Sequence, residues 1–184
     1  MEDVKLAKGG YFLVSIHRQE NVDLPARLEL VLDCLRAIRD HFGLPVLVST
    51  HPRTKVRLAN LSQENLEGIV FHEPFGYLDY NKLQANAFCV VSDSGTISEE
   101  ASIIGFPAVS IRDSIERPEA LETGAMVLTG LNVANLIQSV ELVRSEAKSE
   151  SMPHGYEIQD FSDRVLKFVF STARLHHSWA NLRK

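Results

Sequence analysis

The sequence has only two cysteines, and none of its apolar runs approaches the roughly 20 residues needed to span a bilayer. Cys34 and Cys89 both stand among apolar neighbours, which indicates buried thiols and favours a reducing, cytoplasmic compartment over a disulfide framework. Residues 1–6 carry charges but no apolar signal core, so neither secretion nor a membrane partner is expected.

Charge and metal-ligand spacing argue against two further classes of protein. The formal net charge is −5 at pH 7, which gives no electrostatic reason to expect a nucleic-acid partner. His17, His51 and His72 fall on different predicted loops, and no His-x-x-His or Cys-x-x-Cys spacing occurs. No metal site is therefore predicted.

Two sequence motifs of well-known α/β enzymes are also absent. Residues 92–96 (Ser-Asp-Ser-Gly-Thr) lack the glycine that precedes the nucleophile in a Gly-x-Ser-x-Gly elbow, so Ser94 is not predicted to be a hydrolase nucleophile. Residues 17–20 (His-Arg-Gln-Glu) follow the first predicted strand in place of a Gly-x-Gly-x-x-Gly turn, which argues against a dinucleotide redox cofactor. We therefore expect no cofactor.

The sequence does contain a strict alternation of short apolar segments and longer amphipathic ones. The continuously apolar segments predict buried strands at residues 11–16, 45–49, 68–72, 88–93, 107–112 and 125–128. Apolar residues at helical spacing predict helices at about 24–42, 52–61, 80–87, 96–104, from 118, and at 132–147. This order predicts one doubly wound, Rossmann-like α/β domain with a parallel sheet of about six strands.

A polar stretch at residues 149–156 separates this pattern from a last predicted helix, which begins at about residue 161. We expect residues 157–184 to form a terminal helix that packs apart from the sheet, against another domain. Its apolar stripe consists of Phe161, Val165, Phe168, Val169, Thr172, Leu175 and Trp179.

The most informative segment is residues 90–100, where an apolar strand ends in small polar residues and a helical pattern follows at once. A helix that starts there leaves its first backbone N–H groups unpaired, and with the helix dipole they form an anion site suited to a phosphate. Glu100 follows one turn later, where its carboxylate is placed to accept hydrogen bonds from sugar hydroxyls. The same residues also fit an ordinary turn with a helix cap, so this segment alone leaves both interpretations open.

Polar residues follow each of the first five predicted strands. In an open parallel sheet, ligands bind beyond the carboxyl ends of the strands, so these residues predict one shared site. The segments are 15–21, 49–53, 72–73, 92–96 and 112–119.

Three of these segments carry a specific resemblance. Residues 17–21 (His-Arg-Gln-Glu-Asn), 92–100 (with Ser-Asp-Ser-Gly and Glu-Glu) and 112–119 (Arg-Asp-Ser-Ile-Glu-Arg-Pro-Glu) resemble the non-hydrolysing UDP-N-acetylglucosamine 2-epimerase family in order and spacing. The resemblance covers nearly the whole chain but only the C-terminal half of the family's usual protein. It implies that residues 1–184 are the UDP-binding domain of a two-domain glycosyltransferase-B architecture, with the N-terminal domain absent from this chain.

The resemblance also implies roles for individual residues. His17 matches a histidine that lies near the diphosphate and is needed for activity. Ser94 and Gly95 match residues that hold the phosphates, and Thr96 stands where many members have a second glycine. Glu100 matches the carboxylate that binds the ribose hydroxyls.

Two further matches carry a structural alternative beside the functional one. Tyr80 stands where the family has an aromatic residue beside the uracil, and it also fits a packing residue of a short helix. Stacking an aromatic ring on a base contributes about 1–3 kcal/mol. Arg117 matches an arginine that lines the nucleotide site, where forked bonds to phosphate are available, with a salt bridge to Glu116 or Glu119 as the alternative.

The family reaction, as the resemblance implies, inverts C2 of the sugar by eliminating UDP across C1–C2 and adding it back. This chemistry needs a base for the C2 proton and stabilisation of the departing diphosphate. In the family the acid and base carboxylates come from the N-terminal domain. We therefore expect this chain alone to bind UDP weakly and not to epimerise, and a homodimer is a further family expectation.

Several alternatives stay open at this point. Residues 49–54 and 94–100, with the terminal helix ending near Trp179, look closer to the branch that makes UDP-N-acetyl-L-fucosamine from a 6-deoxy sugar nucleotide. His51 and Pro52 stand where many members have His-x-Asn-Pro, which puts the family's allosteric activation in doubt. A glycosyltransferase would use the same helix and ribose carboxylate, and a non-catalytic nucleotide-binding module would act with a partner chain.

Overall fold

The computed structural model describes residues 6–58, 65–115, 119–122, 124–145 and 155–180. The chain divides into two compact units, Met1–Pro153 and His154–Lys184. Within the described ranges, no helix combines the length and the apolar character needed to cross a membrane.

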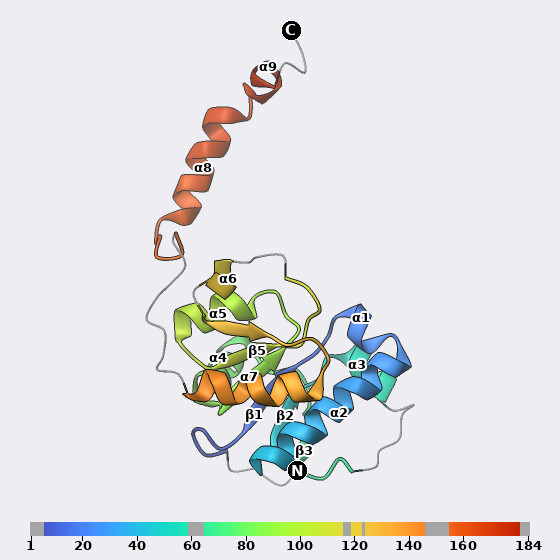
Figure 1. The fold of residues 1–184 in the computed structure, drawn as a ribbon. Helices are drawn as coiled ribbons and strands as arrows, with labels where there is room; N and C mark the ends of the chain where they lie inside the picture. The colour runs from blue at the N-terminus through green and yellow to red at the C-terminus, as the bar shows by residue number, and fades with distance from the viewer. Residues whose placement is uncertain (1–5, 59–64, 116–118, 123, 146–154, 181–184) are drawn as a thin grey trace. The chain divides into compact units, whose positions relative to one another are not determined.

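The first unit is built on a six-stranded, all-parallel sheet, which confirms the predicted Rossmann-like α/β fold (Figure 1). The strand order is β3-β2-β1-β4-β5-β6, so the order reverses between β1 and β4. Ligands of such sheets bind at this reversal, beyond the carboxyl ends of the strands. The strands are β1 (Phe12–Ser15), β2 (Val46–Ser49), β3 (Ile69–His72), β4 (Cys89–Ser92), β5 (Ala108–Ser110) and β6 (Met126–Leu128).

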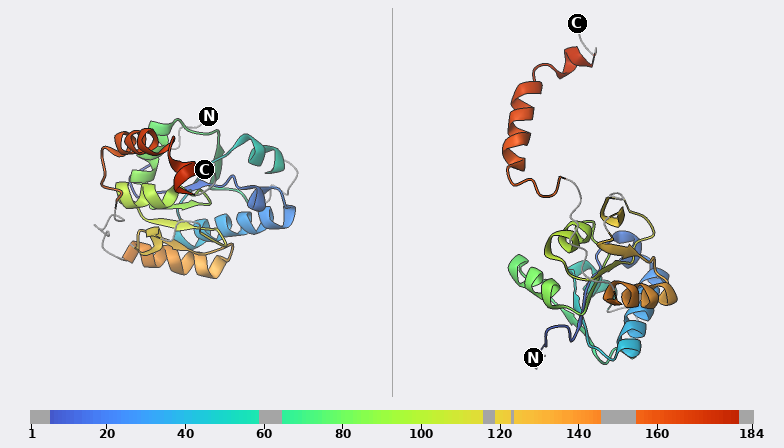
Figure 2. Two further views of the ribbon diagram at one scale, coloured as in Figure 1. Left: turned by 90° about the horizontal axis from the view of Figure 1, so that it is seen from above. Right: turned by 60° about the vertical axis from the view of Figure 1, so that its left-hand side comes forward.

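Helices cover both faces of the sheet, because successive strand residues point to opposite faces and both sets are apolar (Figures 1 and 2). On one face, α2 and α7 contact each other and pack over residues such as Val14 and Val91. On the other face, α4 and α5 pack over residues such as Leu13 and Val90. The helices of this unit are α1 (Gln19–Val22), α2 (Pro25–Phe42), α3 (Pro52–Leu58), α4 (Tyr77–Asn86), α5 (Ile97–Ile104), α6 (Glu119–Glu122) and α7 (Val133–Ser145).

Helix ends follow local chemistry. Pro25 opens α2, where its missing N–H costs no hydrogen bond and its fixed φ suits the first turn. Gly43 and Gly105 close α2 and α5 with φ of 64° and 77°, a left-handed conformation that glycine adopts without strain. Gly105 was the predicted stop of α5, and its N–H donates to the Ala101 carbonyl oxygen over 2.8 Å.

Two helices differ from the sequence-based prediction. Helix α4 begins at Tyr77, so Tyr80 lies inside its first turn rather than at its start. Helix α1 was not predicted at all, because four residues carry no helical period. It buries Asn21 and Val22. The predicted end of the helix from residue 52 and the predicted polar stretch 149–156 lie largely outside the described residues.

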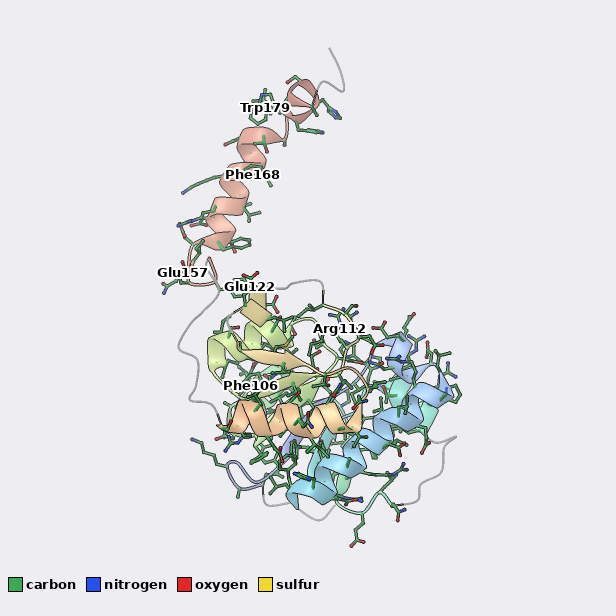
Figure 3. The ribbon with its side chains drawn as sticks, viewed as in Figure 1. Phe106, Arg112, Glu122, Glu157, Phe168 and Trp179 are labelled. Atoms are coloured by element: carbon green, nitrogen blue, oxygen red, sulfur yellow. The ribbon has the colours of Figure 1, made fainter. Side chains whose placement is uncertain are left out.

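The second unit contains two helices where the sequence predicted one. They are α8 (Phe161–Thr172) and α9 (His176–Trp179), with residues 173–175 between them. No residue of α8 is buried, and Phe168 and Trp179 mark the two helices in Figure 3.

Candidate functional site

A row of serines marks the carboxyl ends of four neighbouring strands. Ser15 of β1 pairs with Ser49 of β2 and with Ser92 of β4, and Ser92 pairs with Ser110 of β5. The polar segments that follow these strands therefore leave the sheet at one edge, as the parallel order requires. Figure 3 labels Arg112 just beyond the carboxyl end of β5, and Phe106 just before its amino end.

Asp93 accepts three hydrogen bonds through its side chain at this edge and is completely buried. Its Oδ1 accepts from the backbone N–H of His17 over 3.1 Å and lies 3.3 Å from His17 Nδ1. Its Oδ2 accepts from the backbone N–H of Arg18 and from Asn21 Nδ2, both over 3.0 Å. The carboxylate thus ties the segment after β1 to the end of β4, at the point where the strand order reverses. No role for Asp93 is predicted from the sequence, because its partners lie 72–76 positions away in the chain.

The network continues from Asn21, which is also buried. Asn21 Oδ1 accepts from Arg27 Nε over 3.3 Å and from Arg27 Nη2 over 3.0 Å. The same Nη2 donates to Asp113 Oδ2 over 2.7 Å. One chain of hydrogen bonds therefore joins the segments that follow β4, β1 and β5.

The turn from β4 into α5 stands open beside this network, with Ser94 and Gly95 half-buried and Thr96 exposed. The Ser94 N–H donates to Ser92 Oγ over 3.0 Å, and the hydroxyls of Ser94 and Thr96 lie 3.0 Å apart. Among the described residues, the backbone N–H groups of Gly95, Ile97 and Ser98 have no hydrogen-bond acceptor. The corner thus has backbone donors without an acceptor at the positive end of a helix, of which Gly95 is half-buried and Ile97 and Ser98 are buried.

Glu100 lies on the first turn of α5, where Gln84 of α4 holds it. Gln84 Nε2 donates to Glu100 Oε2 over 2.5 Å. Gln84 is 1% exposed, and its Oε1 is buried with no partner among the described residues. The neighbouring Glu99 accepts instead from the Ser98 hydroxyl over 2.8 Å. The two adjacent carboxylates therefore have different environments.

Tyr80 lies on α4 with its ring half-buried against the apolar cluster under α4 and α5. Burial raises the pKa of Tyr80 to about 12, and the nearby Ser15 side chain at the end of β1 opposes this rise. The ring therefore has a packing role in this structure, while its polar end lies at the same edge as His17.

One predicted site residue and two further histidines of the strand-end segments remain to be placed. Arg117 lies outside the described residues, as do its neighbours at 116 and 118. His51 Nδ1 accepts from the Arg53 N–H over 3.2 Å at the start of α3. His72 stacks on Phe75, with ring centroids 4.2 Å apart.

Two hollows of the first unit, with volumes of about 460 and 600 Å³, lie elsewhere. Lys8 and Asn86 line both of them, and Phe106 and Arg144 also line the smaller one. None of the predicted site residues lines either of these two hollows.

Comparison with known proteins gives a consistent assignment. Residues 1–169 match the protein family described as UDP-N-acetylglucosamine 2-epimerase. A UDP-N-acetylglucosamine 2-epimerase of Methanocaldococcus jannaschii is 37% identical over 149 residues, which cover 79% of this chain and 41% of that protein. A UDP-2,3-diacetamido-2,3-dideoxy-D-glucuronate 2-epimerase of Pseudomonas aeruginosa is 35% identical over 133 residues, which cover 72% of this chain and 37% of that protein.

Solved structures agree. The UDP-N-acetylglucosamine 2-epimerase from Rickettsia bellii superposes with a TM-score of 0.83 at 33% identity, covering 99% of this chain and 50% of that one. The M. jannaschii enzyme in complex with UDP-GlcNAc and UDP gives a TM-score of 0.79 at 33% identity, covering 88% of this chain and 45% of that one. The chain thus spans about half the length of these structures, and its fold is one half of a glycosyltransferase-B-like architecture. Sequence motifs, sheet order and family match agree, and the chain belongs to the UDP-N-acetylglucosamine 2-epimerase family.

Proposed function

We propose that this chain is the C-terminal, UDP-binding half of a sugar-nucleotide 2-epimerase that converts UDP-N-acetylglucosamine to UDP-N-acetylmannosamine. The observation that carries the proposal is the meeting of His17 with the open β4–α5 turn at the reversal of strand order. The M. jannaschii relative, solved with UDP-GlcNAc and UDP, supports a UDP-sugar as the ligand.

The diphosphate is assigned to the amino end of α5. Free N–H groups at Gly95, Ile97 and Ser98 and the helix dipole together attract an anion there. The hydroxyls of Ser94 and Thr96, now bonded to each other, are the further donors at the same turn. Arg117 is retained as a phosphate ligand on the family resemblance, although it lies outside the described residues.

The nucleoside is assigned to the neighbouring side chains of α4 and α5. Glu100 accepts hydrogen bonds from the ribose hydroxyls, with Gln84 holding one carboxylate oxygen and leaving the other for the ligand. Tyr80 is assigned to the uracil, on the family resemblance and because its polar end lies near Ser15 at this edge of the sheet. The ring of Tyr80 also packs against the apolar core, so packing alone would explain a tyrosine at this position.

The chemistry follows from this division of the molecule. Departure of UDP from C1 places negative charge on the diphosphate, which donors at α5 and His17 stabilise. Removal of the C2 proton needs a carboxylate base, and we assign it to the N-terminal half of the family's protein. The isolated chain of 184 residues is therefore expected to bind UDP weakly and to show no epimerase turnover.

Calorimetric titration of UDP into the chain tests the site. Glu100→Gln removes the charge but keeps an acceptor for Gln84, so we expect Kd to rise about 10-fold, as for loss of one charge-assisted hydrogen bond. Glu99→Gln is the matched control, because Glu99 bonds to Ser98 instead, and its Kd should equal that of the wild type. Equal affinity in all three proteins, or no UDP binding by the wild type, would refute the assignment.

The sugar of the substrate is a separate question from the UDP site. The relatives described above are named for N-acetylglucosamine and for a diacetamido-glucuronate. They give no support to the fucosamine-forming branch that residues 49–54 suggested, and that substrate stays the alternative. Assays of both UDP-sugars with the N-terminal half supplied, without any acceptor, separate these substrates and also separate an epimerase from a glycosyltransferase.

A further inference from the structure

We infer that Asp93 is a positioning residue, which holds the His17 ring as its Nδ1–H tautomer so that Nε2 takes up a proton when a diphosphate binds. The ligand in this statement rests on the proposed function, whereas the tautomer rests on the structure alone.

The tautomer follows from which atoms face each other. His17 Nδ1 lies 3.3 Å from Asp93 Oδ1, and an ionised carboxylate only accepts hydrogen bonds. This separation is an ion-pair distance, and it favours the hydrogen on Nδ1, because a lone pair there would face the negative charge of the carboxylate. The neutral ring then has its lone pair on Nε2. Nε2 lies on the far side of the ring from the buried Asp93, and the His17 side chain is 45% exposed.

Asp93 is fixed well enough to impose this choice. Its two oxygens also accept from the backbone N–H groups of His17 and Arg18 and from Asn21 Nδ2. Every one of these partners is a donor, so a hydrogen on either oxygen of Asp93 would face another hydrogen. Asn21 cannot turn its amide round, because its Oδ1 already accepts from Arg27.

The chemical consequence appears when a diphosphate reaches the amino end of α5. Nε2 takes a proton from water, and the resulting imidazolium donates from Nε2 to a phosphate oxygen while its Nδ1–H faces Asp93 Oδ1. As UDP leaves the sugar, this N–H faces the charge that develops on the phosphate. Two cations near His17 already have carboxylate partners. Arg18, the next residue, lies 3.6 Å from Glu20, and Arg53, beyond the end of β2, lies 3.0 Å from Asp23.

His51 provides an internal control, because the same edge holds it in the opposite way. Its Nδ1 accepts from the Arg53 backbone N–H, so the neutral ring must carry its hydrogen on Nε2. The two histidines are therefore expected to show opposite tautomers in one spectrum.

Nitrogen NMR of the histidine-labelled chain reads the tautomers directly, with His17→Gln assigning the His17 signals. Without UDP we expect Nδ1–H for His17 and Nε2–H for His51. With saturating UDP we expect both His17 nitrogens to be protonated and His51 to be unchanged. An Nε2–H tautomer at His17, or a ring that stays neutral when UDP is bound, would overturn the inference.

Calorimetry in buffers of different ionisation enthalpy counts the protons taken up with UDP. At pH 8 the terminal phosphate is already ionised, since its second pKa is about 6. Uptake by the wild type should therefore be lost in His17→Gln, and Asp93→Asn should lose both the uptake and the tautomer. If Asp93→Asn does not fold, the wild-type spectrum decides alone. The expected tautomer without UDP binding refutes the proposed function, whereas UDP binding with the other tautomer refutes this inference.

Discussion

The two ends of strand β4 are both buried, yet they are built from opposite kinds of residue. At the amino end, Phe88 precedes the strand. The centroid of its ring lies 5.3 Å from the ring centroid of Phe12 and 5.5 Å from that of Phe42. The guanidinium of Arg144 covers the outer face of this group, 4.5 Å from the Phe88 centroid. Cys89 begins the strand and is wholly buried.

At the carboxyl end, Ser92 and Asp93 are also buried, but their side chains make hydrogen bonds there. The Ser92 hydroxyl donates to the Ser15 carbonyl oxygen over 3.0 Å and accepts from the Ser94 N–H. Hydrogen bonds are directional and apolar contacts are not. The amino end is therefore suited to stabilising the fold, and the carboxyl end to fixing loop geometry for a ligand.

The largest expected effect separates the two ends through stability. Phe12→Ala removes a completely buried ring from the aromatic group, and we expect it to lower the free energy of unfolding by about 3–5 kcal/mol. Urea denaturation measures the loss, and UDP titration of the folded variant should give the wild-type Kd. A lower UDP affinity in a folded Phe12→Ala protein would contradict the division between the ends.

Alkaline pH gives the next largest effect, again from the apolar regions. Burial raises the pKa of Cys89 to about 12 and that of Cys34 to about 11, from an ordinary value of 9.0. Unfolding restores ordinary thiols, so the unfolded state loses protons first as pH rises. The stabilisation is complete below pH 9 and is then lost, at about 1.4 kcal/mol per pH unit for each thiol.

Urea denaturation between pH 8 and pH 10.5 measures this slope. Cys89→Ala should remove about half of it and leave the part that belongs to Cys34. An unchanged slope in Cys89→Ala would show that another group controls the alkaline transition.

A smaller effect on stability, with an effect on function, is expected at the carboxyl end. Asn21→Ala leaves Asp93 and Arg27 each without one buried partner, which costs about 1–3 kcal/mol. It also loosens the segment that carries His17, so UDP affinity should fall as well. Gln19→Ala, at an exposed position of the same helix, should change neither quantity. Loss of stability in Asn21→Ala with full UDP affinity would mean that the network does not hold the site.

The sequence predicted most of this architecture, because the spacing of apolar residues indicates strands and long helices. It also located the β4–α5 turn, whose residues are contiguous from Ser92 to Glu100. The network around that turn was not predictable in the same way. Asp93 meets Asn21 across 72 positions, and nothing local to either residue indicates the other. Gln84 was missed because a polar residue on a helix is ordinarily exposed, whereas here it is buried beneath Glu100.

Short secondary-structure elements were also not predicted from the sequence. Helix α1 has only four residues, so it shows no period, although its Asn21 is central to the site. The separation of α8 from α9 at residues 173–175 also has no sequence signal, since neither glycine nor proline occurs there.

The smallest expected effect concerns Thr96, which stands where many family members have glycine. Its hydroxyl contacts Ser94 Oγ at 3.0 Å, while its backbone N–H is kept by any residue except proline. Thr96→Gly should therefore change the Kd for UDP by less than about threefold, because the main donors are backbone groups. A much larger loss by calorimetry would assign the phosphate contact to the side chain instead.

Amide NMR of the labelled chain during a UDP titration tests the central claim most directly. The account predicts saturable amide chemical-shift changes that are largest at Gly95, Ile97 and Ser98, whose N–H groups have no acceptor at the start of α5. Smaller changes are expected at His17. The amides at the start of α7 (Val133–Ser145), another helix of the same sheet, should stay in place. Saturable shifts centred away from the β4–α5 turn, or none at all, would contradict the assignment of the diphosphate to this corner.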